Sequence, residues 1–414
     1  MKVFHTSDWH LGHLLYKQER TDEFRYAIDQ VVEMVSSEQP DVFVLSGDVF
    51  DVPAPSNSAQ ELFTTAMLQI HAACPSMPIV VIAGNHDGKA FIDVNRSLWK
   101  LAGVRMVGLL PRRNGNNSLN IRERYDIDEQ VVHIPGKGYV VAVPHVYDAG
   151  YPLLSEDDAD ARTRREQYFK ALLDAVAQRN TEGLPVVLMA HLAISASDTS
   201  WHDFGMVGGL CTTDQSEFGS NYDYLALGHI HQPQTMVHNG RIARYCGSLI
   251  PISFSEESAP HSVSIVEVKA GATTESDIRT MEIAPLRPLR TIPDNPVPFD
   301  QALQHLEDLP CDAPCYVRLN VVRDVDFPGD AMAQAIKALD GKEARFCEFK
   351  CEESEALKQS GQAIAVATSE ELGTLSEMEV ALRSAGGTLP EAYVKMLTYA
   401  LEQLAREEEN NNNE

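Results

Sequence analysis

Five short apolar segments of this chain each end in side chains that can bind a metal ion. Such segments are typical of buried strands, and open α/β sheets bind their ligands outside the carboxyl ends of their strands. We therefore expect a metal centre at one edge of one sheet. The segments are MKVFHTSDWH, VFVLSGDVFD, IVVIAGNHD, VVLMAH and YLALGHIH, and their donors are Asp8, His10, Asp48, Asp51, Asn85, His86, Asp87, His191, His229 and His231.

The chemistry of these donors favours a pair of divalent cations. Carboxylate, amide and imidazole groups without a thiolate suit Mn²⁺, with Mg²⁺ or Fe²⁺ as alternatives. Asp48 follows the small residues Ser46 and Gly47 and is the best candidate to bridge two ions. A carboxylate can span the separation of about 3.5–4 Å that is typical of two-metal hydrolases. Such a pair activates water for in-line attack on a phosphoester.

Each motif taken alone has a simpler explanation. An Asp-x-His pair is common by chance, Gly-Asn-His-Asp is consistent with a tight turn, and His-x-His is consistent with one exposed face of a strand. The ordered set is harder to explain by structure alone, because the end of a strand needs no histidine in order to fold. We therefore interpret the set as a site for phosphoester hydrolysis.

Length and charge limit the class of protein. A chain of 414 residues exceeds one ordinary core, so two or more domains are expected. The net charge of −26, from 34 basic and 60 acidic residues, argues against a surface that binds nucleic acid everywhere. A local site remains open, because bound cations reverse the sign of the field around them. Any strong grip on DNA is then expected to be shared with a partner.

The seven cysteines indicate reduced thiols rather than a disulfide framework. A zinc site is the alternative for the pairs Cys311–Cys315 and Cys347–Cys351. Both pairs lie in or beside strand-like segments, where residues four apart are separated by roughly 13 Å, too far to share one ion. Small buried residues are the favoured interpretation.

No sequence feature indicates a membrane. The chain has no apolar stretch long enough to span a bilayer. Lys2 leads directly into the first strand, without the apolar core of a signal peptide. We expect a cytoplasmic protein with no membrane partner.

The order of apolar strands and amphipathic helices predicts one α/β unit over residues 1–270. Its longer helices are expected at 19–37, 58–73 and 155–180. Prolines crowd residues 285–298, which predicts a semi-rigid connector. A small α/β module is expected at 285–351, and a helical segment at 370–409.

Two stretches allow a structural and a functional interpretation. The cluster of Arg112, Arg113, Arg122 and Arg124 is better explained by a solvated loop than by contact with DNA. An apolar stripe near the end of the chain is usually core, but it follows two domain-sized units, so docking of a partner competes with that reading. The stripe comprises Tyr393, Leu397, Leu401 and Leu404.

The ordered set DWH, GDVFD, GNHD, His191 and GHIH resembles the calcineurin-like metallophosphoesterase family. The segments HTSDWHLG and RYCGSLIPISFSE resemble, more narrowly, the SbcD nuclease subunits of that family, and this resemblance covers roughly the first 260 residues. It implies an α/β fold in which a two-sheet sandwich is flanked by helices. A small α/β capping domain and a helical C-terminal tail are implied to follow it.

The resemblance implies two metal sites that share one carboxylate. The first site comprises Asp8, His10, Asp48 and His231, and the second comprises Asp48, Asn85, His191 and His229. His86 is implied to be a catalytic histidine that binds no metal and protonates the leaving oxygen or stabilises charge on the phosphate. Asp51 and Asp87 are implied to orient imidazoles.

The resemblance also implies partners and activities. SbcD-like subunits form a homodimer within a heterotetramer with an SbcC-like ATPase, which the segment 370–409 is expected to bind. The implied activities are manganese-dependent 3′→5′ exonuclease on duplex ends and endonuclease on hairpins or blocked ends, in DNA repair, recombination and replication.

Two other functions compete with this hypothesis. A stand-alone phosphodiesterase or phosphatase would use the same site on a small or protein substrate, and the charge of −26 favours it. The additional module and the apolar terminal helix argue against it. A non-catalytic scaffold is disfavoured, because every expected ligand position carries a ligand.

Overall fold

The computed structural model describes residues 1–113, 120–153, 160–195, 197–198, 212–324, 326–355 and 357–358. They form two compact units. The first comprises Met1–Arg290 and Pro314–Tyr316, and the second comprises Thr291–Ala313 and the described residues from Val317 onward. Within these ranges, no helix is long and apolar enough to cross a membrane. The predicted helical segment 370–409 lies outside the described residues.

The first unit contains two six-stranded sheets. The strands of the first sheet are β1 (Lys2–Thr6), β2 (Val42–Ser46), β3 (Ile79–Ile82), β4 (Val104–Val107), β13 (Ser262–Glu267) and β14 (Ile278–Glu282), and those of the second are β5 (Val131–Ile134), β6 (Gly138–Ala142), β7 (Val186–His191), β10 (Tyr224–Gly228), β11 (Gln234–His238) and β12 (Arg241–Tyr245). The first sheet has the order β14-β13-β1-β2-β3-β4, and the second has the order β11-β12-β10-β7-β6-β5. Strands β8 (Ala193–Ile194) and β9 (Thr212–Thr213) form a separate short pair.

The central strands of each sheet run parallel to one another. In the first sheet β1 to β4 are parallel, and β13 and β14 extend the sheet in antiparallel fashion beside β1. In the second sheet β6, β7, β10 and β12 are parallel, and the edge strands β5 and β11 are antiparallel to their neighbours. The carboxyl ends of the parallel strands therefore meet at one edge of each sheet.

The two sheets pack against each other through apolar side chains, most of them aliphatic. Successive side chains of a strand point to opposite faces. Val42 and Val44 of β2 lie in the core between the sheets, together with Val187 of β7. Phe43 and Leu45 point the other way, into the core beneath the helices. Because both faces of β2 are covered, its sequence is continuously apolar.

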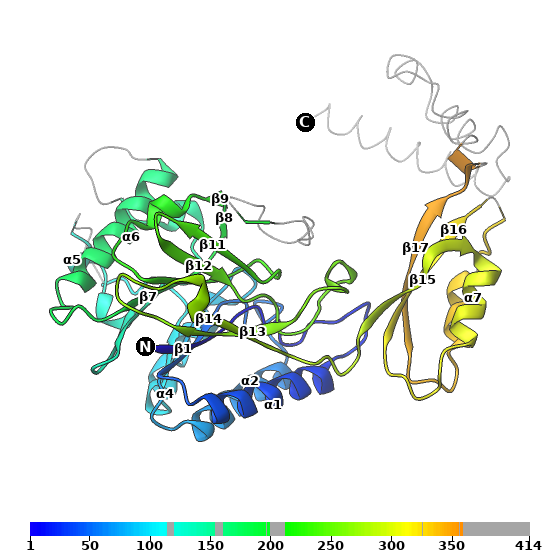
Figure 1. Ribbon diagram of the computed structural model, residues 1–414, viewed down its shortest axis with the longest axis horizontal. Coiled ribbons are helices and arrows are strands. Elements are labelled where there is room, and N and C mark those ends of the chain that lie inside the picture. The colour runs from blue at the N-terminus through cyan, green and yellow to red at the C-terminus, as the bar shows by residue number, and fades with distance from the viewer. Residues whose placement is uncertain are drawn as a thin grey trace, which may run out of the picture. The chain divides into compact units, whose positions relative to one another are not determined.

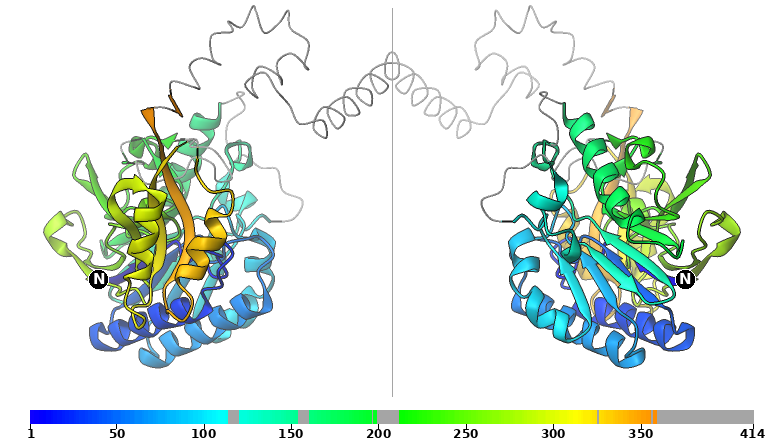
Figure 2. Two further views of the ribbon diagram at one scale, coloured as in Figure 1. Left: turned by 90° about the vertical axis from the view of Figure 1, so that its right-hand side faces the viewer. Right: turned by 90° about the vertical axis from the view of Figure 1, so that its left-hand side faces the viewer.

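Helices cover the outer face of each sheet. Helices α1 (Thr21–Glu38) and α2 (Asn57–Ala73) pack on the first sheet, and α6 (Ala161–Ala177) packs on the second. Figure 1 shows α1 and α2, in blue, on one side of the paired sheets and α6, in green, on the other, and Figure 2 shows the same layers from two further directions. The shorter helices of this unit are α3 (Lys89–Val94), α4 (Arg96–Leu101) and α5 (Ile121–Arg124). These layers confirm the predicted α/β sandwich of two sheets flanked by helices.

The described residues of the second unit form a three-stranded sheet with two helices. Its strands are β15 (Leu289–Pro298), β16 (Tyr316–Arg323) and β17 (Arg345–Glu353), in that order, and its helices are α7 (Phe299–Glu307) and α8 (Ala331–Ala338). The predicted connector at 285–298 is therefore wrong over most of its length, because β15 runs through it. Proline lacks an N–H donor and is tolerated at the edge of a sheet, which is where β15 lies.

One histidine is fully buried between the two sheets of the first unit. His5 of β1 places its Nδ1 2.8 Å from the Tyr224 hydroxyl of β10. Burial, and secondarily the positive charge of Arg244, lowers the pKa of His5 to about 3. The imidazole is therefore neutral in the folded chain at every pH where the chain is expected to work.

We expect the double substitution His5→Leu and Tyr224→Phe to reduce the loss of folding stability that occurs as the pH falls below 6.5. A histidine in the unfolded chain takes up a proton near its ordinary pKa of 6.5, whereas the folded His5 does so only near 3. The contribution of neutral His5 to the free energy of unfolding is therefore complete above pH 6.5. It is lost as the pH falls toward 3, by about 1.4 kcal/mol for each pH unit.

Thermal unfolding at about pH 8 and about pH 5.5 measures this effect. The Tm of the double variant, relative to that of the native chain, should rise as the pH falls. An equal difference in Tm at both pH values would contradict the assignment of a neutral, buried His5.

Candidate metal centre

The predicted donors come together from two sheets. Three strands of the first sheet and two of the second supply them: Asp8 and His10 follow β1, Asp48 and Asp51 follow β2, Asn85, His86 and Asp87 follow β3, His191 ends β7, and His229 and His231 follow β10. The expectation of a single sheet edge is therefore wrong. The sheets pack face to face, and their parallel strands end on the same side, so the two edges together form the site.

Hydrogen bonds join the two sheets at this edge. His191 Nδ1 lies 2.9 Å from the backbone oxygen of Ser46, at the end of β2. The Ser46 hydroxyl donates to the backbone oxygen of Ala226 on β10, at 3.2 Å. The backbone N–H of His229 donates to Asp8 Oδ1, at 2.9 Å. The donors of the two sheets are therefore held at fixed positions relative to one another.

The backbone is strained where the donors lie. Four of them have a positive φ: Asp8 (52°), His10 (46°), Asp48 (49°) and His229 (99°). This conformation is rare for residues other than glycine and concentrates at functional sites. Gly47, before Asp48, has a φ of 91°, and a Cβ there would collide with the His191 imidazole. Glycine at position 47 therefore permits the end of β2 to approach β7.

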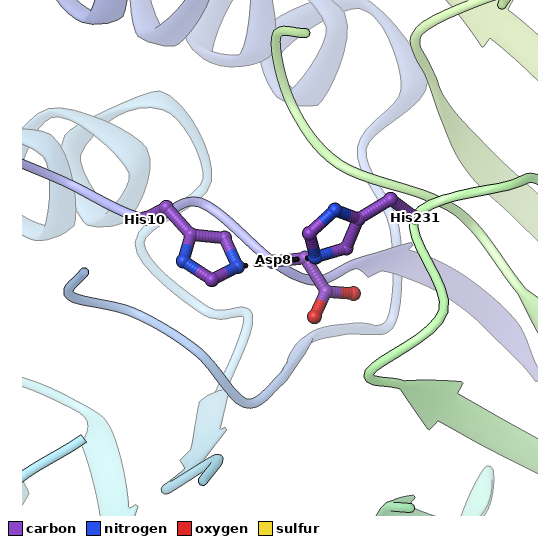
Figure 3. Close-up of side chains that lie close together, drawn as sticks. All are labelled: Asp8, His10 and His231. Carbon is purple, nitrogen blue, oxygen red and sulfur yellow. Dashed lines mark hydrogen bonds between the residues drawn. The ribbon is translucent and has the colours of Figure 1, made fainter. Parts of the chain in front are cut away.

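Asp8, His10 and His231 form the first donor group. One ligand atom from each lies within 4.8 Å of the others, and all three residues are buried. The Nε2 atoms of His10 and His231 are 3.2 Å apart, and Figure 3 shows these two nitrogens facing each other beside the Asp8 carboxylate. The Ser7 hydroxyl donates to Asp8 Oδ2 at 2.5 Å, which holds the carboxylate in place.

Asp48, His191 and His229 form a second donor group, again within 4.8 Å of one another. Asn85 adds an amide oxygen to this group. Its Oδ1 lies 2.9 Å from His191 Nε2 and 2.9 Å from His229 Nδ1. A carboxylate, an amide and two imidazoles thus converge, as predicted for the second metal site.

Asp48 lies between the two groups. Its Oδ2 is 3.2 Å from His191 Nε2 and 3.7 Å from His10 Nε2. Burial by itself would raise the pKa of Asp48, but His191 and then His10 hold it well below its usual range. An ionised carboxylate between two sets of donors is what a bridging ligand requires.

The electrostatic balance of the site fits divalent cations. Burial opposes the charge on His10 and His191, yet nearby carboxylates raise the pKa of each to about 9. For His10 these are Asp51, Asp48 and Asp8. The buried carboxylates therefore stabilise positive charge beside them, and without a metal ion the protonated imidazoles provide that charge. The same donors at this spacing suit divalent cations, whose binding releases those protons.

The two supporting carboxylates contact different partners. Asp51 Oδ1 lies 3.4 Å from His10 Nδ1, where it can orient that imidazole. Asp87 differs from the expectation, since its carboxylate accepts hydrogen bonds from three backbone N–H groups, at 2.8 to 3.1 Å. The donors are Val49, Phe50 and Gly84. Asp87 therefore supports the site by joining the turn after β2 to the turn after β3.

His86 lies beside both donor groups and is partly exposed. Its backbone N–H donates to Asp48 Oδ1, at 2.9 Å, and its Nδ1 lies 2.9 Å from the backbone oxygen of Asp51. The rings of His86 and His10 are 4.9 Å apart. His86 also forms a group of close donors with His10 and Asp48, so the structure brings it near the metal ligands.

Glu256 is a residue of the site that the sequence analysis missed. Its Oε1 lies 2.9 Å from His231 Nδ1, and its Oε2 accepts a hydrogen bond of 2.8 Å from the Ser248 hydroxyl. The carboxylate is almost fully buried, in a short turn at Phe254–Glu256. The only signal was its place in the motif RYCGSLIPISFSE, which identified the family without giving Glu256 a role.

Comparison with known protein families shows the family to which the chain belongs. Residues 1–233 match the model of the family described as calcineurin-like phosphoesterase. The chain belongs to the calcineurin-like phosphoesterases. This membership confirms the predicted family and makes the chain a metal-dependent phosphoesterase. Residues 285–384 match a second family model, described as the Type 5 capsule protein repressor C-terminal domain.

Within this family, the chain is similar to SbcD nuclease subunits. This phosphoesterase is 29% identical to the SbcD subunit of the SbcCD nuclease of Bacillus subtilis over 279 residues, which cover 66% of this chain and 67% of that protein. It is 30% identical to the SbcD subunit of the Rhodobacter capsulatus SbcCD nuclease over 278 residues, with the same coverage. The predicted resemblance to SbcD subunits is therefore confirmed. Among solved structures, TT1561 of Thermus thermophilus has a TM-score of 0.40 and 13% identity, covering 68% of this chain and 99% of that one.

We expect Glu256→Gln to weaken the binding of Mn²⁺ by about 10- to 100-fold, because a carboxylate that holds a ligating imidazole fixes its tautomer and raises its basicity. Calorimetric titration of the metal-free chain measures the dissociation constant. Glu282→Gln, at an exposed carboxylate on β14, is the matched control. Equal affinity in the two variants would contradict the role of Glu256.

Proposed function

We propose that this chain is the DNA-cleaving subunit of an SbcCD-type complex and hydrolyses phosphodiester bonds at a centre of two divalent cations. The observation that carries the proposal is the convergence of six donors from two sheets around the ionised carboxylate of Asp48. The relatives named as SbcD subunits of the SbcCD nuclease support DNA as the substrate.

In this proposal each cation has its own ligands. Asp8, His10 and His231 would hold the first; Asn85, His191 and His229 would hold the second; and Asp48 would be shared by both. Mn²⁺ suits these donors best, with Mg²⁺ or Fe²⁺ as alternatives. When bound, such ions polarise the phosphate oxygens and lower the pKa of an attacking water molecule.

The role proposed for His86 is to act on the leaving oxygen. A carbonyl oxygen only accepts hydrogen bonds, so the contact with the Asp51 backbone oxygen places a hydrogen on His86 Nδ1. The other ring nitrogen is then left for the substrate, where it donates a proton when the ring is charged. The hydrogen bond from the His86 backbone to Asp48 holds this residue against the ligands.

We further propose an SbcC-like ATPase as the partner, in the cytoplasm, with the segment 370–409 as its docking site. A net charge of −26 leaves little of the surface suited to DNA, so a partner that supplies part of the grip fits the composition. The activities proposed for the complex are 3′→5′ exonuclease on duplex ends and endonuclease on hairpins or blocked ends, in repair, recombination and replication.

The expected homodimer, within a heterotetramer, is supported by exposed apolar side chains. Val94, Leu98 and Leu101 follow one another at helical spacing along α3 and α4 and are 71%, 67% and 87% exposed. Leu68 on α2 is half exposed. Large exposed apolar side chains in neighbouring elements are typical of a surface that binds protein.

Hydrolysis by the purified chain with Mn²⁺ tests the proposed function. A hairpin DNA is compared with a chromogenic phosphodiester, with and without the ATPase partner and ATP. Cleavage of the DNA that ATP stimulates is the expected result. Turnover of the diester with DNA untouched under every condition would contradict the nuclease function, and would favour the stand-alone phosphodiesterase that the acidic composition suggests.

We expect His86→Ala to keep the fold and both cations but to lose about 10²–10⁴-fold in the rate of hydrolysis, the usual contribution of a general acid. Metal content and turnover are measured together, with His305→Ala, exposed on α7, as the control. Unchanged turnover would contradict the catalytic role. Loss of one cation per chain would instead make His86 a ligand, as its proximity to His10 and Asp48 allows.

A further inference from the structure

A large cavity lies beside the metal centre in the first unit. Its volume is about 1010 Å³, which is at the upper end of the range for ligand pockets. Its lining includes Lys89, the first residue of α3, and His145 and Tyr147, which follow β6. The cavity therefore has room for a ligand larger than one small molecule.

The cavity is basic, although the chain is strongly acidic. Cationic side chains in its lining outnumber carboxylates by two to one, and they are Lys89, Arg96, Arg112, Arg113, Arg124 and Arg164. Arginine binds phosphate through paired hydrogen bonds of fixed geometry. Arg112 is exposed, and its side chain has no partner among the described residues. Three of the four arginines that were expected in a solvated loop, Arg112, Arg113 and Arg124, thus line a concave surface.

His145 connects this cavity to the metal centre. It lines the cavity, and its Nδ1 lies 3.1 Å from the backbone oxygen of His191. The rings of His145 and His191 are 6.1 Å apart. Lys89 lies on the same side, two residues after Asp87. A nucleic-acid strand with one phosphate at the metal ligands can therefore extend its next phosphates into the cavity.

An aromatic ring stands in the lining. Tyr147 is 54% exposed, and its ring is 4.9 Å from that of His145, nearly perpendicular to it. Lys89 Nζ lies 4.4 Å from the centre of the Tyr147 ring. Cationic side chains combined with an exposed aromatic ring are the usual means of holding single-stranded nucleic acid, because unstacked bases lie against the ring. The bases of a duplex are stacked on one another and are less available to it.

We propose that this cavity binds the single-stranded segment that adjoins the phosphate held at the metal centre, with arginines on its phosphates and Tyr147 against a base. The inference rests on the proposed nuclease function and adds a subsite to it. Two arginines carry the test, Arg96 of α4 and Arg112. Among the described residues, the Arg112 side chain has no partner, and that of Arg96 has only a long contact of 3.4 Å with Asp93.

The double variant Arg96→Gln and Arg112→Gln tests the proposal in the full chain with Mn²⁺. We compare kcat/KM for a single-stranded oligonucleotide of about six residues with kcat/KM for a chromogenic phosphodiester. The ratio of the two should fall by about 10-fold or more. The dependence of log KM for the oligonucleotide on log salt should weaken by about 1.4, because each phosphate contact of a single strand contributes about 0.7.

Exposed arginines elsewhere on the first unit supply the matched control. Arg25→Gln with Arg290→Gln makes the same change in net charge and should leave the ratio unchanged. If the native chain cleaves both substrates and the two double variants give the same ratio, the cavity is not the subsite. If the native chain cleaves the diester but no DNA, with or without the ATPase partner and ATP, the proposed nuclease function fails instead.

Tyr147 gives an independent test of the bound strand. Tyr147→Ala should lower kcat/KM for the oligonucleotide by about 10-fold, whereas Tyr147→Phe, which keeps the ring, should retain it. An oligonucleotide that lacks bases next to the cut should be insensitive to both changes. Equal losses with and without bases would contradict the stacking role.

Discussion

The close approach of the two sheets at the carboxyl ends of β2, β7 and β10 is the constraint on which the metal centre depends. His191 Nδ1 reaches the backbone oxygen of Ser46 across the sheets, and a Cβ at Gly228 would collide with that same oxygen. Small side chains such as Val44 and Ala226 fill the space between the sheets. Because protein interiors are close-packed, larger side chains here would move the donors of one sheet away from those of the other.

That geometry buries carboxylates close together, where they are stable in the ionised form only beside positive charge. Asp8 and Asp48 are buried carboxylates, and Asp48 stays ionised because positive charge lies against it. Divalent cations supply such charge and also reverse the sign of the local field. An acidic chain can therefore attract a phosphodiester at one place on its surface, and the basic cavity around Arg96 and Arg112 extends that region. The net charge of −26 argues against binding of nucleic acid over the whole surface, which is consistent with the proposed partner that holds the DNA.

Sequence patterns predicted the elements and the donors of this site because both have a local signal. The helix expected at 19–37 is α1, and each donor stands at the end of an apolar strand or within five residues of it. Features that depend on tertiary packing were not predictable. Glu256 lies 25 residues after His231 and contacts it only because the chain folds back at the turn. The prolines of residues 285–298 predict a connector, but they are tolerated in strand β15 because this strand lies at the edge of its sheet. Likewise, nothing local indicates that two sheets rather than one supply the donors.

Electron paramagnetic resonance of the metal-free chain titrated with Mn²⁺ tests the central claim most directly. A carboxylate that bridges two ions about 3.5–4 Å apart couples their electron spins. Two equivalents of Mn²⁺ are therefore expected to produce the spectrum of an exchange-coupled pair. A spectrum of isolated Mn²⁺ ions at every ratio of metal to chain would show that the donors around Asp48 do not form one dinuclear centre.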